Sequence, residues 1–442
     1  MNREILRLAI PSIISNLTIP LLGLVDLAIV GHLGSPAYIG AIAVGGLLFN
    51  LVYWNFGFLR LGASGLTAQA RGRGDHRETT RVLARSLGLA GLSSLLVLLL
   101  QHPLARLVIP LLDASGETAR HAARYFTICI WGAPAVLGLY CFKGWFIGMQ
   151  NSRYPMYIAL VVNLVNIAVS LALVHWFGMK IEGVATGTLV AQYAGLLLAI
   201  FLCRRRYPLP GGWSAARESF RGREIRRFLA LERDIFLRSA CLIAVTAAFT
   251  AAGARQGDTI LAVNTLLMQL FTLFSYIMDG FAHAAEALVG RHVGACQRRQ
   301  TRRVIRALFG WGVALALLFT LLYAVAGRGL LALLTDDAGI TRVADRYYYW
   351  VLAIPLAGFP AFLWDGILVG ATAGRQMLIS MFASAVAFFA ILHAIPVASH
   401  NHLLWLAFIT YLLLRGILQT ILAYRDREAI FGRPGDAAMP VT

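Results

Sequence analysis

The stretch that decides the fold is RYFTICIWGAPAVLGLYCFKGWFIGMQNSR, residues 124–153, because it recurs in altered form as RYYYWVLAIPLAGFPAFLWDGILVGATAGR, residues 346–375. Five residues recur with a constant offset of 222: Arg124, Tyr125, Gly144, Gly148 and Arg153 match Arg346, Tyr347, Gly366, Gly370 and Arg375. A looser match joins 43–72 to 262–290. Both matched stretches lie in apolar helical runs, so the repeat indicates a duplicated bundle of membrane helices.

Composition supports a membrane protein. Hydrophobic residues make up 59% of the 442 residues and charged residues only 14%, where a soluble chain carries about a quarter. Runs of about 20 apolar residues are long enough to span a bilayer. We predict twelve such spans, at 8–31, 40–62, 82–101, 121–143, 154–176, 181–203, 235–254, 258–281, 304–325, 344–368, 376–396 and 403–424. The runs are continuous, whereas the strands of a membrane barrel alternate, so helices are predicted.

The predicted fold is an all-α polytopic membrane protein with twelve transmembrane helices in two six-helix lobes. Six spans is an even number, so both lobes begin on the same side, and a pseudo-twofold axis along the membrane normal relates them. The predicted domains are an N-lobe over 1–203, a cytoplasmic linker over 204–234, a C-lobe over 235–424 and a cytoplasmic tail over 425–442. Many secondary transporters have this architecture, so a carrier is the first hypothesis.

The net charge of +18 raises the question of nucleic-acid binding. The arginines, however, gather in the even-numbered loops, for example Arg71 to Arg85, Arg204 to Arg233 and Arg291 to Arg306. This asymmetry is the positive-inside signal and places both termini in the cytoplasm. We therefore expect contact with membrane lipids and no nucleic-acid partner.

Charged residues inside spans are the candidates for function, because each costs about 2.5–3.5 kcal/mol at the bilayer centre on insertion scales. Asp26 lies in the outer half of the first span, in the run LLGLVDLAIV, with no base one helical turn away. A buried, isolated carboxylate is costly to ionise and could exchange a proton near neutral pH. The alternatives are a neutral acid that is hydrogen-bonded for packing and an acid that faces an aqueous cavity.

Polar residues on the fifth and sixth spans form a second candidate. Asn163, Asn166 and Ser170 share one side of a helix, and Thr188 follows on the next. Polar groups in a span face protein or water, so these residues could line a pocket with Asp26, although hydrogen bonding between helices without function remains open.

Four further charges form two candidate pairs between the lobes. Arg60 and Asp279 correspond by the looser repeat match, and Lys143 and Asp365 correspond by the 222-residue offset. Structural pairing and a bridge that breaks between two states both remain open. Five scattered cysteines with no CxxC, and the absence of HExxH, P-loop and nucleophile-elbow motifs, predict no metal, no cofactor and no enzyme activity.

Five ordered motifs carry a family resemblance: LRLAIP at 6–11, IPLLGLVD at 19–26, GLTAQA at 65–70, RDIFLRS at 233–239 and LWDG at 363–366. On these the chain resembles the multidrug and toxic compound extrusion (MATE) transporters, DinF-like branch, over essentially its whole length. The resemblance implies two lobes around a V-shaped cleft, alternating access, and export of amphiphilic, often cationic compounds in exchange for protons or sodium.

The resemblance also implies roles for individual residues. Asp26 matches the first-helix aspartate assigned to coupling and substrate binding, and Asn166 and Thr188 match its polar partners. Pro11 matches the proline at which the first helix bends, and Pro20 is a second proline in that span. Ser170 stands where many relatives have a second aspartate, which places more of the coupling on Asp26.

The apolar part of the seventh span, 237–253, carries no carboxylate, whereas sodium-coupled branches use a glutamate there, so proton coupling is favoured. The expected function is a proton-coupled antiporter for amphiphilic or cationic compounds, acting as a monomer in a bacterial inner membrane. The alternative within carriers is a flippase for a lipid-like or lipid-linked substrate.

Overall fold

The computed structural model describes residues 1–31, 36–108, 116–210, 220, 222–335, 337–394 and 401–431, and every regular element in these ranges is a helix. Residues 211–219 and 221 of the predicted linker, and 432–442 of the predicted tail, lie outside the described residues. Long helices follow from the composition, because backbone groups in hydrocarbon must be bonded within their own segment.

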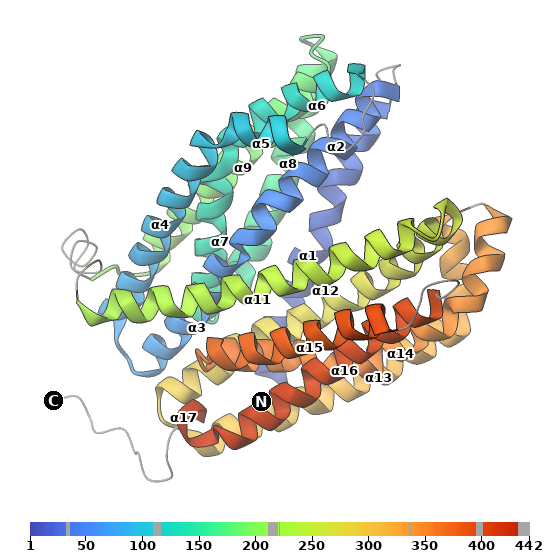
Figure 1. Ribbon diagram of the computed structural model, residues 1–442. Helices are drawn as coiled ribbons and strands as arrows, with labels where there is room; N and C mark the ends of the chain where they lie inside the picture. The colour runs from blue at the N-terminus through green and yellow to red at the C-terminus, as the bar shows by residue number, and fades with distance from the viewer. Residues whose placement is uncertain are drawn as a thin grey trace. The chain divides into compact units, whose positions relative to one another are not determined.

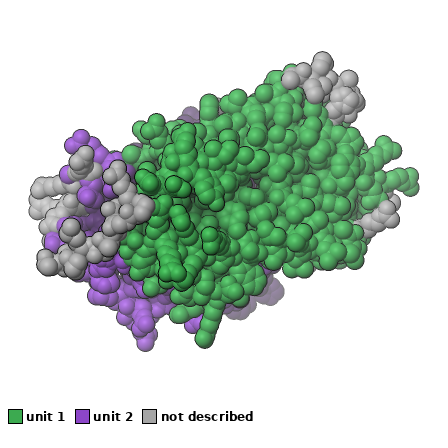
Figure 2. Space-filling model, turned by 90° about the horizontal axis from the view of Figure 1, so that it is seen from below, with its two compact units in different colours: residues 1–9, 229–442 green, residues 10–228 purple. Residues whose placement is uncertain are grey.

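The chain divides into two compact units (Figure 2). The N-unit is Ile10–Phe228, and the C-unit is Met1–Ala9 together with Leu229–Thr442. The division falls inside the first helix, just before Pro11, and the second proline of that helix is Pro20. The helices of the N-unit, after α1 (Asn2–Gly31), are α2 (Pro36–Trp54), η1 (Asn55–Gly57), α3 (Phe58–Gly72), α4 (His76–Leu99), α5 (Gln101–Val108), α6 (Gly116–Cys129), η3 (Ile130–Gly132), α7 (Ala133–Gly148), α8 (Arg153–His175) and α9 (Ile181–Arg206) (Figure 1).

The C-unit contains fewer but longer helices (Figure 1). They are α11 (Arg223–Ala254), α12 (Asp258–Gly294), α13 (Arg298–Leu334), α14 (Ala338–Gly370), α15 (Gly374–Ala394), α16 (Asn401–Arg425) and α17 (Arg427–Phe431). Among the described residues, twelve helical segments are long and apolar enough to cross a membrane, which confirms the predicted number.

Several spans are longer than the sequence predicted. The second, predicted over 40–62, runs over 38–72. Its last part, α3, mixes buried apolar residues with polar ones such as Arg60 and Gln69, so hydropathy marked only the apolar part. A hydropathy window finds the hydrocarbon-crossing part of a helix and misses its polar extension.

The duplicated glycines have equivalent roles in the two units. On α7, Gly144 lies against the backbone of Arg60, and Gly148 is so close to α3 that an added Cβ would lie 2.6 Å from the Ser64 carbonyl oxygen. On α14, Gly366 lies against the backbone of Ala282, and a Cβ at Gly370 would lie 2.7 Å from the Glu286 carbonyl oxygen. Small residues let helix backbones approach closely, so the repeat encodes one helix crossing twice.

These contacts refine the looser part of the repeat. Gly144 and Gly366 are equivalent, and they touch Arg60 and Ala282 respectively. Ala282, and not Asp279, therefore occupies the position in the C-unit that corresponds to Arg60. The structural offset is the same 222 residues throughout this helix pair.

The units differ in how their helices are interrupted. In the N-unit, the 3₁₀ turns η1 and η3 break the second and fourth spans, and Pro134 stands in the first turn of α7. In the C-unit, α12 and α14 are continuous, although α14 contains Pro355 and Pro360. A proline in the first helical turn lacks only an N–H that would be unbonded anyway, whereas an internal proline removes a backbone bond and favours a bend.

A buried polar cluster on the first span

Asp26 lies on α1 in the N-unit and is only 4% exposed. Its neighbours along the helix, Ile29 and Val30, belong to an apolar core that also includes Ala41 of α2, Tyr125 of α6 and Val184 of α9. Asp26 is thus buried beside an apolar core to which helices α1, α2, α6 and α9 of one unit contribute. Such a group requires hydrogen-bond partners, because a buried polar group without them is destabilising.

Asn166 and Thr188 supply these partners. Thr188 Oγ1 donates to Asp26 Oδ2 at 3.3 Å. In the amide orientation that gives each polar atom a complementary partner, Asn166 Nδ2 donates to Asp26 Oδ1 at 3.0 Å, and Asn166 Oδ1 lies 2.9 Å from Thr188 Oγ1. The cluster therefore joins α1, α8 and α9, and both partners found for Asp26 in the described part of the chain are uncharged.

Thr188 is the shared member of this cluster. Its hydroxyl lies near three acceptors: the Asp26 carboxylate, the Asn166 carbonyl oxygen and, at 3.1 Å, the Val184 carbonyl oxygen. A hydroxyl has one proton to donate and lone pairs with which to accept. Thr188 can therefore donate to Asp26 in one state and accept from it in another.

Ser170 and Asn163 lie on the same helix as Asn166 but do not bond to Asp26 among the described residues. Ser170 is fully buried, its Oγ has no hydrogen-bond partner in the described part of the chain, and it packs against Gly187 of α9. Asn163 Nδ2 donates to the Thr18 carbonyl oxygen of α1 at 3.3 Å. Asn163 thus links α8 to the backbone of α1 at Thr18, which precedes Asp26 in the sequence.

Tyr125 is a member of the site that the sequence reasoning missed. This buried residue of α6 lies beside Cys129 and Thr188, and it interacts electrostatically with Asp26. In the sequence, Tyr125 stands out because it recurs as Tyr347, which indicates the duplication but gives no role for the side chain. The signal that could have found it is a phenol ring inside the predicted fourth span, 121–143.

Three of the four charges predicted as pairs between lobes, Lys143, Asp365 and Asp279, interact with residues of their own unit. Lys143 Nζ donates to Asn16 Oδ1 of α1 at 3.4 Å. Asp365 of α14 forms ion pairs with Arg238 of α11 and Arg415 of α16.

The cluster around Asp365 contains two further groups. Gln419 Nε2 donates to Asp365 Oδ1 at 2.7 Å. Asp279 of α12 interacts electrostatically with Arg238 and Arg415. Bridges from Arg60 to Asp279 and from Lys143 to Asp365 stay predictions. The sequence alone assigns no role to Arg238 and Arg415. The structure shows that they are the ion-pair partners of Asp365.

A metal site is not found: no group of three or more His, Cys, Asp or Glu side chains that could hold a metal ion occurs among the described residues.

The observations define a class of protein: a polytopic membrane protein made of a duplicated six-span bundle, with a buried acid inside the first bundle.

Comparison with known proteins identifies the family. The MatE family model matches the chain twice, over residues 11–172 and 235–396, so the chain belongs to the MatE family. The chain is 39% identical to DNA damage-inducible protein F of Escherichia coli (strain K12) over 94% of its own length and 90% of that protein. Members of this family are transporters, and the chain is accordingly a membrane transport protein.

A further relative and a solved structure are consistent with this family assignment. A probable multidrug resistance protein NorM from Deinococcus radiodurans is 27% identical, with 78% of this chain and 77% of that protein covered. The outward-facing structure of a multidrug resistance MATE family transporter of the MOP superfamily has a TM-score of 0.86 at 17% identity, covering 97% of this chain and 96% of that one. The structural match confirms the predicted fold.

Proposed function

We propose that this protein is a proton-coupled antiporter that exports amphiphilic, cationic organic compounds by alternating access across a bacterial inner membrane, with both termini in the cytoplasm. The observation that carries the proposal is the burial of Asp26 against two uncharged partners, Asn166 and Thr188. The proposal needs no cofactor, takes H⁺ and not Na⁺ as the coupling ion, and treats the chain as a monomer.

The hydrogen-bond geometry supports a site with two protonation states. When Asp26 is ionised, Thr188 and Asn166 both donate to it. When Asp26 carries a proton on Oδ2, that proton is donated to Thr188 Oγ1. The Thr188 hydroxyl then turns to the Asn166 or the Val184 carbonyl oxygen. In both states each oxygen of Asp26, Asn166 and Thr188 keeps a hydrogen-bond partner, so the proton can enter and leave without leaving one of these acceptors unpaired.

The charge of Asp26 couples this proton to substrate. An ionised Asp26 attracts a cationic compound, and a protonated one does not, so proton and substrate compete for one carboxylate. In the proposed cycle, Asp26 takes a proton from the outer side, releases the compound there, and returns the proton inward. The bound species shift the protein between its two states only by their difference in affinity for them.

The test uses the purified full chain in liposomes, with pH and sodium gradients imposed separately. We expect a fluorescent lipophilic cation to be driven by the pH gradient and not by the sodium gradient. Sodium-driven transport alone would refute H⁺ coupling. Movement of a labelled phospholipid without any movement of the cation would favour the flippase alternative instead.

A further inference from the structure

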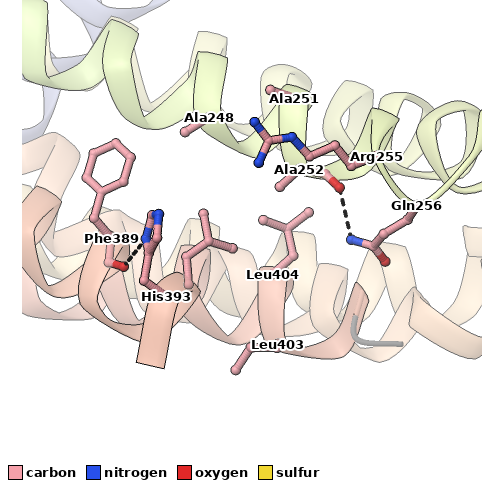
Figure 3. Close-up of a pocket in the computed structure, with 10 residues that line it drawn as sticks. Ala248, Ala251, Ala252, Arg255, Gln256, Phe389, His393, Leu403 and Leu404 are labelled. Atoms are coloured by element: carbon pink, nitrogen blue, oxygen red, sulfur yellow. Dashed lines mark hydrogen bonds between the residues drawn. The ribbon is translucent and has the colours of Figure 1, made fainter. Parts of the chain in front are cut away.

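A mainly apolar groove lies in the C-unit between the ends of α11, α15 and α16 (Figure 3). Its volume is about 350 Å³, within the range of about 300–1,000 Å³ that is usual for ligand sites. The walls are almost wholly apolar and include Ala248, Ala251 and Ala252 of α11, Phe389 of α15, and Leu403 and Leu404 of α16. The alanines fall on one face of α11, at i, i+3 and i+4, and this leaves the space open.

The groove opens where three helices end. α11 ends at Ala254, α15 ends at Ala394 and α16 begins at Asn401, so all three termini lie at the same end of their spans. A helix that crosses the hydrocarbon ends near the headgroup layer of the bilayer. The apolar walls therefore face acyl chains, and the mouth lies at the depth of lipid headgroups.

Three polar groups stand at this mouth. Arg255 is exposed, and no ion pair of its guanidinium occurs among the described residues. His393 Nδ1 donates to the Phe389 carbonyl oxygen at 2.8 Å, which leaves its Nε2 as an acceptor in the neutral ring. Gln256 Nε2 donates to the Ala252 carbonyl oxygen at 3.2 Å, which leaves its Oε1 as an acceptor. In Figure 3, Arg255 reaches over the groove from α11, and His393 points into it from α15.

We propose that this groove binds an anionic phospholipid of the surrounding bilayer. The phosphate lies on the Arg255 guanidinium, and a hydroxyl of a glycerol headgroup donates to His393 Nε2 or Gln256 Oε1. One acyl chain lies along the alanine face of α11. Arginine is suited to phosphate because its planar fork presents paired donors.

Charge separates this site from the proposed transport site. A cationic compound is repelled by Arg255 and attracted by Asp26, so the groove does not take the exported substrate. The proposal stands independently of the coupling ion. A lipid seated between α11 and the pair α15 and α16 would fill a gap that no side chain of the described residues fills.

The experiment is native mass spectrometry of the delipidated full chain titrated with phosphatidylglycerol or with phosphatidylcholine of the same acyl chains. We expect phosphatidylglycerol to bind more tightly, and Arg255→Gln to weaken it about fivefold to tenfold. Ala251→Phe, at an exposed position on the groove wall, should block both lipids at this site.

The matched control is Arg342→Gln, which removes another exposed arginine from the C-unit. It should leave binding unchanged. Equal binding of the two lipids, or equal losses in Arg255→Gln and Arg342→Gln, would overturn the proposal. So would undiminished phosphatidylglycerol binding by both groove variants, because it would place the lipid elsewhere. Because the readout is lipid binding, failure here leaves the transport proposal untouched.

Discussion

Asp26 of the N-unit is buried within its span and Asp365 of the C-unit is 14% exposed, but the chemistry that surrounds these two acids is opposite. In the N-unit, Asp26 is hydrogen-bonded to an amide and a hydroxyl. In the C-unit, Asp365 is hydrogen-bonded to an amide and held by two guanidinium groups, those of Arg238 and Arg415. One fold unit, duplicated, has therefore produced one acid with neutral partners and one acid inside an ionic cluster.

The difference in partners indicates which of the two acids, Asp26 or Asp365, can gain and lose a proton at low cost. The Thr188 hydroxyl can turn when a proton arrives on Asp26, Asn166 is uncharged, and no opposite charge is left alone. Protonating Asp365 would instead leave two buried arginines facing a neutral group. Removing one member of a buried ion pair is strongly destabilising, because the other charge remains without compensation. We therefore interpret Asp26 as the functional acid and Asp365 as a structural one.

The largest expected effect is that of Asp26→Asn on transport. Loss of the titratable group should reduce pH-driven uptake of a lipophilic cation in proteoliposomes to the level of empty vesicles. The variant should still fold, because Asn can keep hydrogen bonds to Thr188 and Asn166. Asp258→Asn, which removes an exposed acid at the start of α12, is the control and should transport normally. Wild-type rates in Asp26→Asn would reject the role of this residue.

Asp365→Asn should act on stability. Among the described residues, Asp279 is then the acid that remains near Arg238 and Arg415, so we expect the free energy of unfolding to fall by about 3–5 kcal/mol. Unfolding of the purified protein by a denaturing detergent measures this. If Asp365→Asn were fully stable but inactive, the contrast drawn between the two acids would be wrong.

An uncharged hydrogen-bond network in the C-unit allows the cost of losing a charge to be compared with the cost of losing a buried hydrogen bond. The amides of Asn264 and Asn401 bond to each other at 2.7 and 2.8 Å, and Trp405 Nε1 donates to Asn264 Oδ1 at 2.9 Å. Asn264→Leu should cost about 1–3 kcal/mol, because it leaves buried donors unpaired. A loss as large as that of Asp365→Asn in the same unfolding assay would show that burial, and not charge, sets the cost.

The smallest effect is expected at Ser170, on the same helix as Asn166. Its buried hydroxyl has no partner in the described part of the chain, so Ser170→Ala removes an unpaired polar group at nearly constant volume. Stability should change by less than about 1 kcal/mol, in either direction. Transport should persist with an unchanged pH profile. A shifted profile would mean that Ser170 takes part in the Asp26 site.

Prediction from sequence succeeded where the signal was local or periodic. The number of spans follows from hydropathy, and the repeat was visible in the duplicated glycines, which the structure places at an equivalent helix crossing in each unit. It was less complete where contacts join distant segments. Tyr125 of α6 reaches the Asp26 cluster, although about 100 residues separate the two in the chain. Arg238 and Arg415 lie 127 and 50 residues from Asp365 in the chain, so the sequence does not show that they pair with it.

What the sequence by itself determined is the membrane class, the twelve helices and the duplication, because insertion into hydrocarbon depends on the composition of each segment separately. What only the tertiary structure decided is which charges meet: the position of Thr188 between Asp26 and Asn166, and the enclosure of Asp365 by two arginines. The reason is physical. A buried charge must be compensated by whichever side chains the packing brings within a few ångströms, and spacing along the chain does not specify that distance.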